Sequence, residues 1–332
     1  MQQSLFAISS PQRRSAIARF AAQAQLVEEK RTVEYFRLAT RSILNRCHSP
    51  RMPFDWTINP YRGCEIACKY CYARYTHEFM ELRDPFDFED KIYAKLWDRE
   101  GFRKDLAKAP LRDAIAIGTA TDPYQPAERR FGVTRAILEE LAGEGGRRIY
   151  LTTKSDLVLR DVDVLLDVAR RNTLCVSLTV TTMDAELARL LEPKAPRPDL
   201  RMKTVKELSR QGLGTGVLCC PVIQLINDGL AGLEGVAKEA SRAGAQWIGS
   251  SVLFLKPGAC QVFLPFIELN FPHLSGRFRR LFARRAFLRG DYPGAIRRKM
   301  NMLRDKYGLH GRPVEYPVEA AGDSGQLDLE FR

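Results

Sequence analysis

Short runs rich in apolar residues alternate with longer amphipathic segments through the middle of the chain. The runs at 114–118, 148–153 and 174–180 are rich in Ile, Leu, Val and Thr and lie next to turn residues or polar segments, which is typical of buried strands. The segment 156–170 instead places its apolar residues at helical spacing. This alternation predicts an α/β fold in which helices cover a parallel sheet.

The predicted elements form about seven strand–helix units. We expect strands at 54–59, 91–95, 114–118, 148–153, 174–180, 216–223 and 246–254. We expect helices between 95 and 108 and near 134–142, 156–170, 184–191, 199–211 and 233–243. Such units favour a partial or near-complete (β/α) barrel, in which chemistry lies at the carboxyl ends of the strands. Because no Gly-x-Gly-x-x-Gly follows a strand, a Rossmann dinucleotide site is disfavoured.

The alternation is lost toward both ends, which predicts three segments: an N-terminal extension (1–50), a barrel (51–264) and a basic, mainly helical C-terminal extension (265–332). Residues 1–27 hold Arg13, Arg14 and Arg19 and no acidic residue, which is compatible with organellar import but favours an N-terminal helix. No uncharged stretch suggests a membrane span, and no secretory apolar region is present. We therefore expect a cytoplasmic protein.

Positive charge is concentrated in one late segment. The 332 residues carry a formal net charge of +12. Residues 276–312 contain 12 Lys/Arg and 2 Asp/Glu, so this segment alone contributes +10. Such a segment suits a polyanion, with nucleic acid, DNA or RNA, as the leading candidate. An acidic membrane surface or a protein partner is an alternative.

The same segment also has a purely structural interpretation. Phe278, Leu281, Phe282 and Phe287 recur at roughly helical spacing, so they can pack on the barrel while the arginines face solvent. Both interpretations can hold at once.

Three cysteines stand close together in the segment 59–72, NPYRGCEIACKYCY. Cys64, Cys68 and Cys71 have the spacing C-x3-C-x2-C. Eight cysteines in 332 residues are too few for a disulfide scaffold, and the clustering indicates a metal site. Three thiolates suit a [4Fe–4S] cluster with one iron left open. Structural zinc with His77 as fourth ligand is the alternative, although its ligand spacing is unusual.

The triplet, with Tyr70 before its third cysteine, resembles the signature of the radical S-adenosylmethionine (SAM) superfamily. The context NPYRGCEIACKYCYAR resembles the group related to spore photoproduct lyase, and the resemblance runs from about residue 49 to 257. It implies that Cys64, Cys68 and Cys71 hold a [4Fe–4S] cluster whose open iron chelates SAM. It also implies reductive cleavage of SAM, hydrogen-atom abstraction from a substrate, and a low-potential electron donor such as flavodoxin or ferredoxin.

The resemblance further implies a set of SAM contacts. They are Tyr70, Thr119, Thr121, Asp122, Lys154, Ser177 and Asn227. Lys154, at a strand end, suits the carboxylate of SAM, and the oxygens of Thr119 to Asp122 suit its ammonium group. An exposed strand-end lysine and a plain turn are the structural alternatives.

One position departs from the lyase pattern. In spore photoproduct lyase, the strand that corresponds to 114–122 carries the hydrogen-donating cysteine. This chain has Thr119 at about that position. A hydroxyl cannot replace a thiol as hydrogen-atom donor, so thymine-dimer repair by that route is not expected. The catalytic residue is therefore unknown, and Tyr124, Cys219 and Cys220 are candidates, each with packing as the alternative role.

Three functional hypotheses follow. The first is a radical SAM enzyme that modifies or repairs nucleic acid. The second is radical SAM modification of a peptide, a protein or a small molecule. The third is a non-enzymatic iron–sulfur or zinc-binding module, for which an open iron and SAM contacts would have no use.

Overall fold

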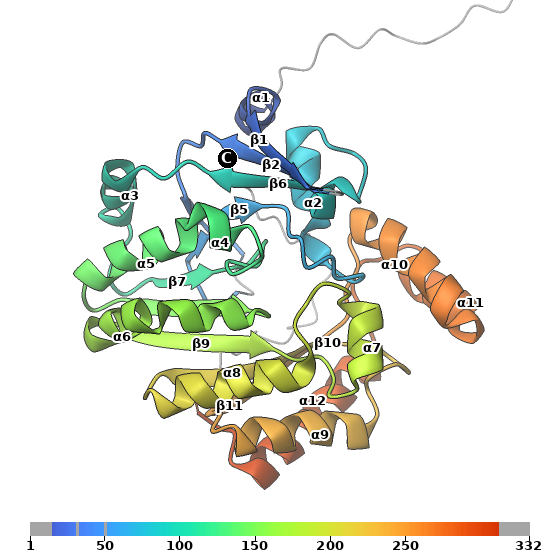
Figure 1. The fold of residues 1–332 in the computed structure, drawn as a ribbon. Helices are drawn as coiled ribbons and strands as arrows, with labels where there is room; N and C mark the ends of the chain where they lie inside the picture. Colours follow the sequence, from blue (N-terminus) through green and yellow to red (C-terminus); the bar gives the residue numbers. More distant parts are fainter. Residues whose placement is uncertain (1–14, 31–32, 50–51, 312–332) are drawn as a thin grey trace, which may run out of the picture.

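Six parallel strands lie side by side in the main sheet of the computed structural model, which describes residues 15–30, 33–49 and 52–311 (Figure 1). The sheet order is β11-β10-β9-β8-β7-β4-β3. The strands are β3 (Leu44–Arg46), β4 (Trp56–Ile58), β7 (Ala114–Ile117), β8 (Arg148–Thr153), β9 (Thr173–Thr179), β10 (Gly214–Val222) and β11 (Trp247–Val252). β3 pairs antiparallel with β4 at one edge. Within these residues β3 and β11 are opposite edges, so the sheet is a partial barrel, as predicted.

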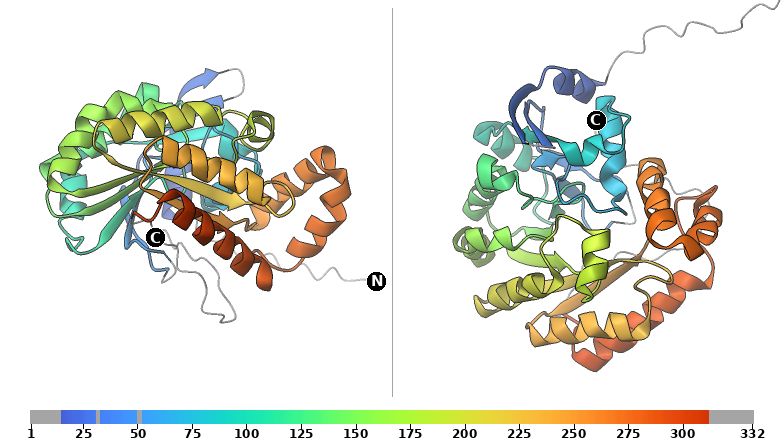
Figure 2. Two further views of the ribbon diagram at one scale, coloured as in Figure 1. Left: turned by 90° about the horizontal axis from the view of Figure 1, so that it is seen from below. Right: turned by 45° about the vertical axis from the view of Figure 1, so that its right-hand side comes forward.

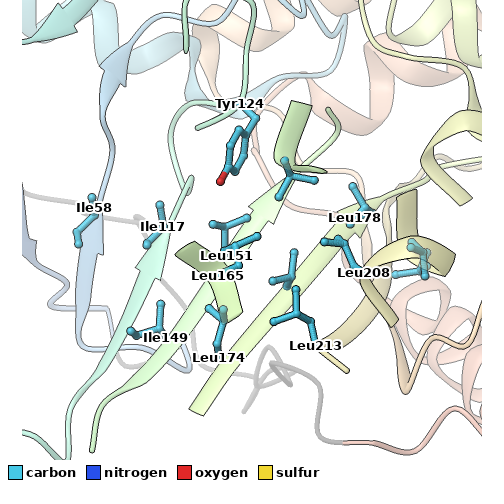
Figure 3. Packing of buried hydrophobic residues seen from close by; sticks show 14 of the residues in the cluster. Ile58, Ile117, Tyr124, Ile149, Leu151, Leu165, Leu174, Leu178, Leu208 and Leu213 are labelled. Carbon is cyan, nitrogen blue, oxygen red and sulfur yellow. The ribbon is translucent and has the colours of Figure 1, made fainter. Parts of the chain in front are cut away.

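Helices cover the outer face of this sheet (Figure 2). They are α3 (Arg99–Leu106), α4 (Glu128–Phe131), α5 (Val133–Gly143), η2 (Asp156–Asp161), α6 (Val162–Arg171), α8 (Pro198–Arg210), α9 (Leu230–Arg242) and α12 (Asp291–Tyr307). The short helix α7 (Ala185–Leu191) lies apart from them and packs Leu187 and Leu191 into the apolar cluster that includes Cys64 and Cys68. Figure 3 shows the core between the layers, where Ile117, Leu151 and Leu178 of the strands meet Leu165 and Leu208 of α6 and α8. Burial of such side chains stabilises the fold by about 1.5–3 kcal/mol each.

A second, four-stranded sheet has the order β1-β2-β6-β5. Its strands are β1 (Gln25–Lys30), β2 (Val33–Leu38), β5 (Tyr61–Arg62) and β6 (Lys91–Lys95). The strand predicted at 91–95 therefore forms. The prediction that it is one of the seven barrel strands is wrong, because it belongs to the second sheet. β6 pairs with β2 and β5, because the chain before it, η1 (Tyr72–Met80) and α2 (Asp87–Asp90), does not cross back over the main sheet.

The N-terminal helix is observed as α1 (Ala16–Ala22), whose N-cap Ser15 accepts a hydrogen bond from Ala18. The strand pair β1–β2 that follows was not predicted. Residues 1–14, on which part of the import interpretation rests, lie outside the described residues. The division of the chain at residues 50 and 264 stays a prediction.

The C-terminal region is mainly helical, as expected, with α10 (Pro257–Asn270), α11 (Pro272–Phe282) and α12. Phe278 and Phe282 pack inward from α11, but the placement of Phe287 on the same helical face is wrong. The helix ends at Phe282, and Phe287 forms an antiparallel bridge with Phe254. Figure 2 shows α10 and α11 standing out from the helices that cover the sheet. Arg312 lies outside the described residues.

No helix in the described part of the chain combines the length and the apolarity needed to cross a membrane.

Candidate active site

Three cysteines share one cavity at the carboxyl ends of the parallel strands. Cys64, Cys68 and Cys71 line this cavity, whose volume is about 340 Å³. The ends of β7 to β11 supply other parts of its wall, namely Thr119, Thr121, Asp122, Lys154, Thr179, Cys220 and Ser251. A cavity of this size suits a small-molecule ligand.

The cysteine loop depends on a glycine at its start. Gly63 has φ +85°, and a Cβ there would lie 2.7 Å from the carbonyl oxygen of Lys91 and 2.9 Å from that of Phe88. This close approach lets the Cys64 amide donate to the Phe88 oxygen at 2.8 Å. Only glycine fits both the left-handed conformation and the space.

Gln125, which lies between the turn 119–122 and α4, holds the same loop by hydrogen bonds. Its Nε2 donates to the Gly63 oxygen at 3.0 Å, and its Oε1 accepts from the Glu65 amide at 2.9 Å. The side chain is fully buried. A buried amide with both ends bonded holds the cysteine loop against the turn that is the candidate for SAM contacts.

Arg74 supports the loop from the other side. Its guanidinium donates to the Cys68 carbonyl oxygen at 3.1 Å and pairs with Glu89 at 2.6 Å. Since the guanidinium is buried, this pairing is what makes its charge tolerable.

Burial sets the protonation of the three thiols. It raises the pKa of Cys64 well above its usual value and that of Cys68 to about 12, while the positive charge of Lys154 acts in the opposite direction on Cys68. Burial also raises the pKa of Cys71, and Arg74 opposes it. Metals bind cysteine in its thiolate form. A cofactor that brings its own positive charge would therefore stabilise the thiolates of these three residues against the effect of burial.

The donor set fits a polynuclear cluster better than zinc. Within residues 15–30, 33–49 and 52–311, no three His, Cys, Asp or Glu side chains converge on a point that could hold a single metal ion. Zinc with His77 as fourth ligand is wrong, because this ring lies against Phe88 and Tyr93 and its Nε2 is 3.1 Å from the Lys91 oxygen. His77 is not part of the cavity wall.

Lys154 places a positive charge in the cavity wall. Burial lowers the pKa of its ammonium group, but Glu192 and the thiolate form of Cys68 favour the charged lysine and outweigh burial, so the pKa lies above its usual value. The Nζ atom is 5.8 Å from the centre of the Tyr70 ring, which also lines the cavity. A charged lysine here can bind a carboxylate.

The turn after β7 lines the cavity and also ties neighbouring loops together. Asp122 accepts from the Thr153 hydroxyl at 2.6 Å and from the Lys154 amide at 2.7 Å. Thr121 donates to the Gly63 oxygen at 2.6 Å, and Thr119 accepts from Asn59 Nδ2 at 3.0 Å. The predicted contact residues Thr119, Thr121 and Asp122 are thus brought together with Lys154 and the cysteines.

Two predicted SAM contacts lie outside the cavity wall. Ser177 is buried within β9, opposite Thr152 and Gly216. Asn227 donates from Nδ2 to the Thr181 oxygen at 2.9 Å and accepts from the Ile223 amide at 2.5 Å. In this structure Asn227 holds a turn after β10.

Of the three candidate catalytic residues, one lines the cavity and two do not. Tyr124 lies among the apolar side chains of the core (Figure 3). Cys219 is fully buried and contacts the Thr181 oxygen at 3.7 Å. Cys220 alone of the three lines the cavity, and burial raises the pKa of its thiol.

Several residues of the site were not found from the sequence. Gln125 follows the predicted contact residues 119–122, and Thr179 lies within the strand predicted at 174–180, but neither gave a separate signal. Phe254 and Phe287, which line the cavity, come from segments far apart in the chain. Their meeting depends on the bridge between them.

The comparisons with known proteins agree on one family. The Radical SAM superfamily model matches residues 58–229. The chain is 30% identical over 293 residues to the uncharacterized protein Rv2578c of Mycobacterium tuberculosis, covering 87% of this chain and 86% of that protein. It is 27% identical over 191 residues to the uncharacterized protein MJ0683 of Methanocaldococcus jannaschii, covering 58% and 68%.

A solved structure shares the fold. Spore photoproduct lyase complexed with dinucleoside spore photoproduct superimposes with a TM-score of 0.62 at 15% identity, covering 82% of this chain and 79% of the lyase. The family match spans more than half of the chain and includes all three cavity cysteines. The chain therefore belongs to the radical SAM superfamily and is an enzyme that uses a [4Fe–4S] cluster and SAM and needs a reductant.

Proposed function

We propose that this radical SAM enzyme acts on nucleic acid. Cys64, Cys68 and Cys71 would hold the cluster, and Lys154 would bind the carboxylate of SAM. The reduced cluster and SAM, when bound, supply hydrogen-atom abstraction, as in the superfamily. The chain itself orients SAM through the turn 119–122. It excludes water with apolar wall residues such as Phe88 and Leu253.

One observation supports the proposal of a nucleic-acid substrate. The connection between α11 and α12 contributes Phe287 to the cavity wall and Arg285 and Arg289 to a separate groove of about 390 Å³. Arg277, Arg280, Leu281 and Leu288 complete the lining of that groove. Arginines, which suit phosphate contacts, therefore come from the same short segment as a wall residue of the cavity.

Four basic residues of 276–312 outside the groove lining have structural partners. Arg279 pairs with Glu268 and Lys306 with Glu234, each at 2.5 Å. Lys299 donates to the Asp228 oxygen at 2.9 Å, and Arg304 to the Ile248 oxygen at 2.8 Å. These contacts bind α11 and α12 to their neighbours. Of the groove arginines, Arg277 donates to Gln224 Oε1 at 3.3 Å. We define the candidate interface by the groove lining on α11 and the connection 283–290, so it is narrower than the basic segment.

The test compares two sets of variants of the reconstituted holoenzyme. In the first, Arg277, Arg280, Arg285 and Arg289 are changed to Gln; in the second, the exposed Arg297 and Arg298 of α12, which lie outside the groove lining, are changed to Gln. Binding of a labelled oligonucleotide is measured by fluorescence anisotropy between about 50 and 200 mM salt.

We expect the groove variant to lose affinity and to reduce the slope of log Kd against log salt by up to about 3, with a smaller change in the control. Nucleic acid should also stimulate formation of 5′-deoxyadenosine by the wild-type holoenzyme under reducing conditions. Equal affinity and an equal salt slope for the groove variant and the wild type would refute the nucleic-acid proposal.

We further propose that flavodoxin or ferredoxin supplies the electron and that the enzyme works in the cytoplasm. All eight cysteines are free thiols in the structure, which supports a reducing compartment. The SAM contacts proposed for Ser177 and Asn227, and the hydrogen-donor role of Cys220, stay predictions.

A further inference from the structure

Three aromatic rings form a ladder in the wall of the cavity. Tyr72 and Phe254 have ring centres 5.0 Å apart, and Phe254 and Phe287 are stacked with centres 5.1 Å apart and an interplanar angle of 16°. All three rings line the cavity. They come from the start of η1, the residues after β11 and the connection between α11 and α12, so the fold assembles them from distant segments.

Hydrogen bonds to backbone carbonyl oxygens hold the rings of the ladder in place. The Tyr72 hydroxyl donates to the carbonyl oxygen of Thr119, in the turn that faces the cavity. The Leu255 amide donates to the Ala286 oxygen at 2.9 Å, which fixes Phe254 and Phe287 relative to each other. The rings of Phe254 and Phe287 nevertheless stay partly exposed. Positioned, partly exposed rings can add a further planar group to a stack at a small entropic cost.

The arginine groove and the aromatic ladder both draw on the connection between α11 and α12. Arg285 and Arg289 flank Phe287 in the sequence and line the groove together with Leu281 and Leu288. Among the described residues, no acidic side chain lines the groove. Arginines and a stacked ring that come from one short connection are the side chains with which proteins bind unpaired nucleic-acid strands, because arginines contact phosphates and rings stack on bases.

We propose that the enzyme binds its nucleic acid as an unpaired or extruded strand, with backbone phosphates in the arginine groove and a base stacked on Phe287 at the mouth of the cavity. This inference rests on the proposed nucleic-acid substrate. A paired base cannot reach the cavity from within a duplex, because its faces are covered by its neighbours.

The test uses a single-stranded oligonucleotide, its matched duplex, and holoenzyme variants Phe287→Leu and Phe287→Tyr. We expect the single strand to bind at least tenfold more tightly than the duplex. Phe287→Leu should lose about tenfold in affinity for the single strand and little for the duplex, whereas Phe287→Tyr should retain binding. Fluorescence of 2-aminopurine in the strand should be quenched on binding to the wild type and recover in Phe287→Leu. Iron content and circular dichroism check that the variants are folded.

The failures are distinguishable. If the duplex binds as well as the single strand, or if Phe287→Leu binds the single strand like the wild type while the groove variant loses binding, the stacking inference is overturned and the nucleic-acid proposal stands. If neither form of nucleic acid binds, both are overturned.

Discussion

The hydroxyl of Tyr70 donates a hydrogen bond to Oε1 of Glu192, and this contact joins the cysteine loop to the turn after α7. Glu192 in turn pairs with Arg201 at 2.5 Å, and both side chains are almost fully buried. Arg201 also donates to the Thr179 oxygen at 2.9 Å, at the cavity wall. A continuous buried network therefore runs from the cysteine loop to the end of β9.

This network predicts that Glu192→Gln destabilises the protein. Glutamine keeps a hydrogen-bond acceptor for Tyr70 but leaves the buried Arg201 without a counter-charge, which costs about 3–5 kcal/mol. At about 2–4 °C per kcal/mol, the Tm should fall by roughly 6 °C or more, as measured by circular dichroism. Glu186→Gln, at an exposed position of α7, is the control and should leave Tm nearly unchanged. Equal Tm values for the two variants would contradict this role.

The cysteine ligands are tested by iron content. Alanine at Cys64, Cys68 or Cys71 should each abolish cluster assembly on anaerobic reconstitution, because two remaining thiolates cannot hold the cluster. Cys175→Ala is the matched control, since Cys175 lies on β9 away from the cavity wall. Iron analysis and visible absorption measure the result, and a full iron load in any of the three variants would falsify the ligand assignment.

Lys154→Ala should separate SAM binding from cluster binding. The lost cation leaves the SAM carboxylate without its charged partner, so the Kd for SAM should rise at least about tenfold, which corresponds to about 1.4 kcal/mol. Isothermal titration calorimetry on the reconstituted protein measures the Kd. Iron content should not change. Lys108→Ala, at an exposed position, is the control, and a wild-type Kd in Lys154→Ala would count against the assignment.

The buried strands of the barrel were predictable because a strand covered on both faces carries a nearly continuous apolar run, as at 114–118 and 148–153. The pattern at 91–95 identified a strand but not its partners, since alternation reports burial and not pairing. The cysteine triplet was predictable because its ligands are local in sequence. Gln125 was not, because its contacts with Gly63 and Glu65 span about 60 residues.

Gly63→Ala tests whether the glycine sets the cysteine loop. The left-handed conformation alone costs a non-glycine residue about 1–2 kcal/mol, and the new Cβ would push against two carbonyl oxygens. We expect a lower Tm and a reduced iron load. Gly232→Ala on α9, where a Cβ meets nothing within 4 Å, is the control and should be neutral or slightly stabilising. Normal iron and Tm in Gly63→Ala would show that the loop tolerates a side chain.

The buried imidazole of His77 should make the protein less stable in mild acid. Burial, with help from nearby Arg62, Lys91 and Arg74, lowers the pKa of its imidazole to about 3. Below about pH 6.5 the unfolded chain binds a proton at this histidine and the folded chain does not, so protonation favours unfolding. The stability contribution of neutral His77 is complete above pH 6.5 and is lost, at up to about 1.4 kcal/mol per pH unit, as the pH falls toward 3.

His77→Gln should therefore flatten the pH dependence of stability, even if it lowers stability at neutral pH. The measurement is the free energy of unfolding in urea between pH 7 and about pH 4.5, because the slope against pH reports the proton difference and not the packing change. His273→Gln, at an exposed position of α11, should keep the wild-type slope. If His77→Gln also keeps that slope, then the acid sensitivity has another source, and His77 is not the buried neutral group that its contacts with Phe88, Tyr93 and the Lys91 oxygen indicate.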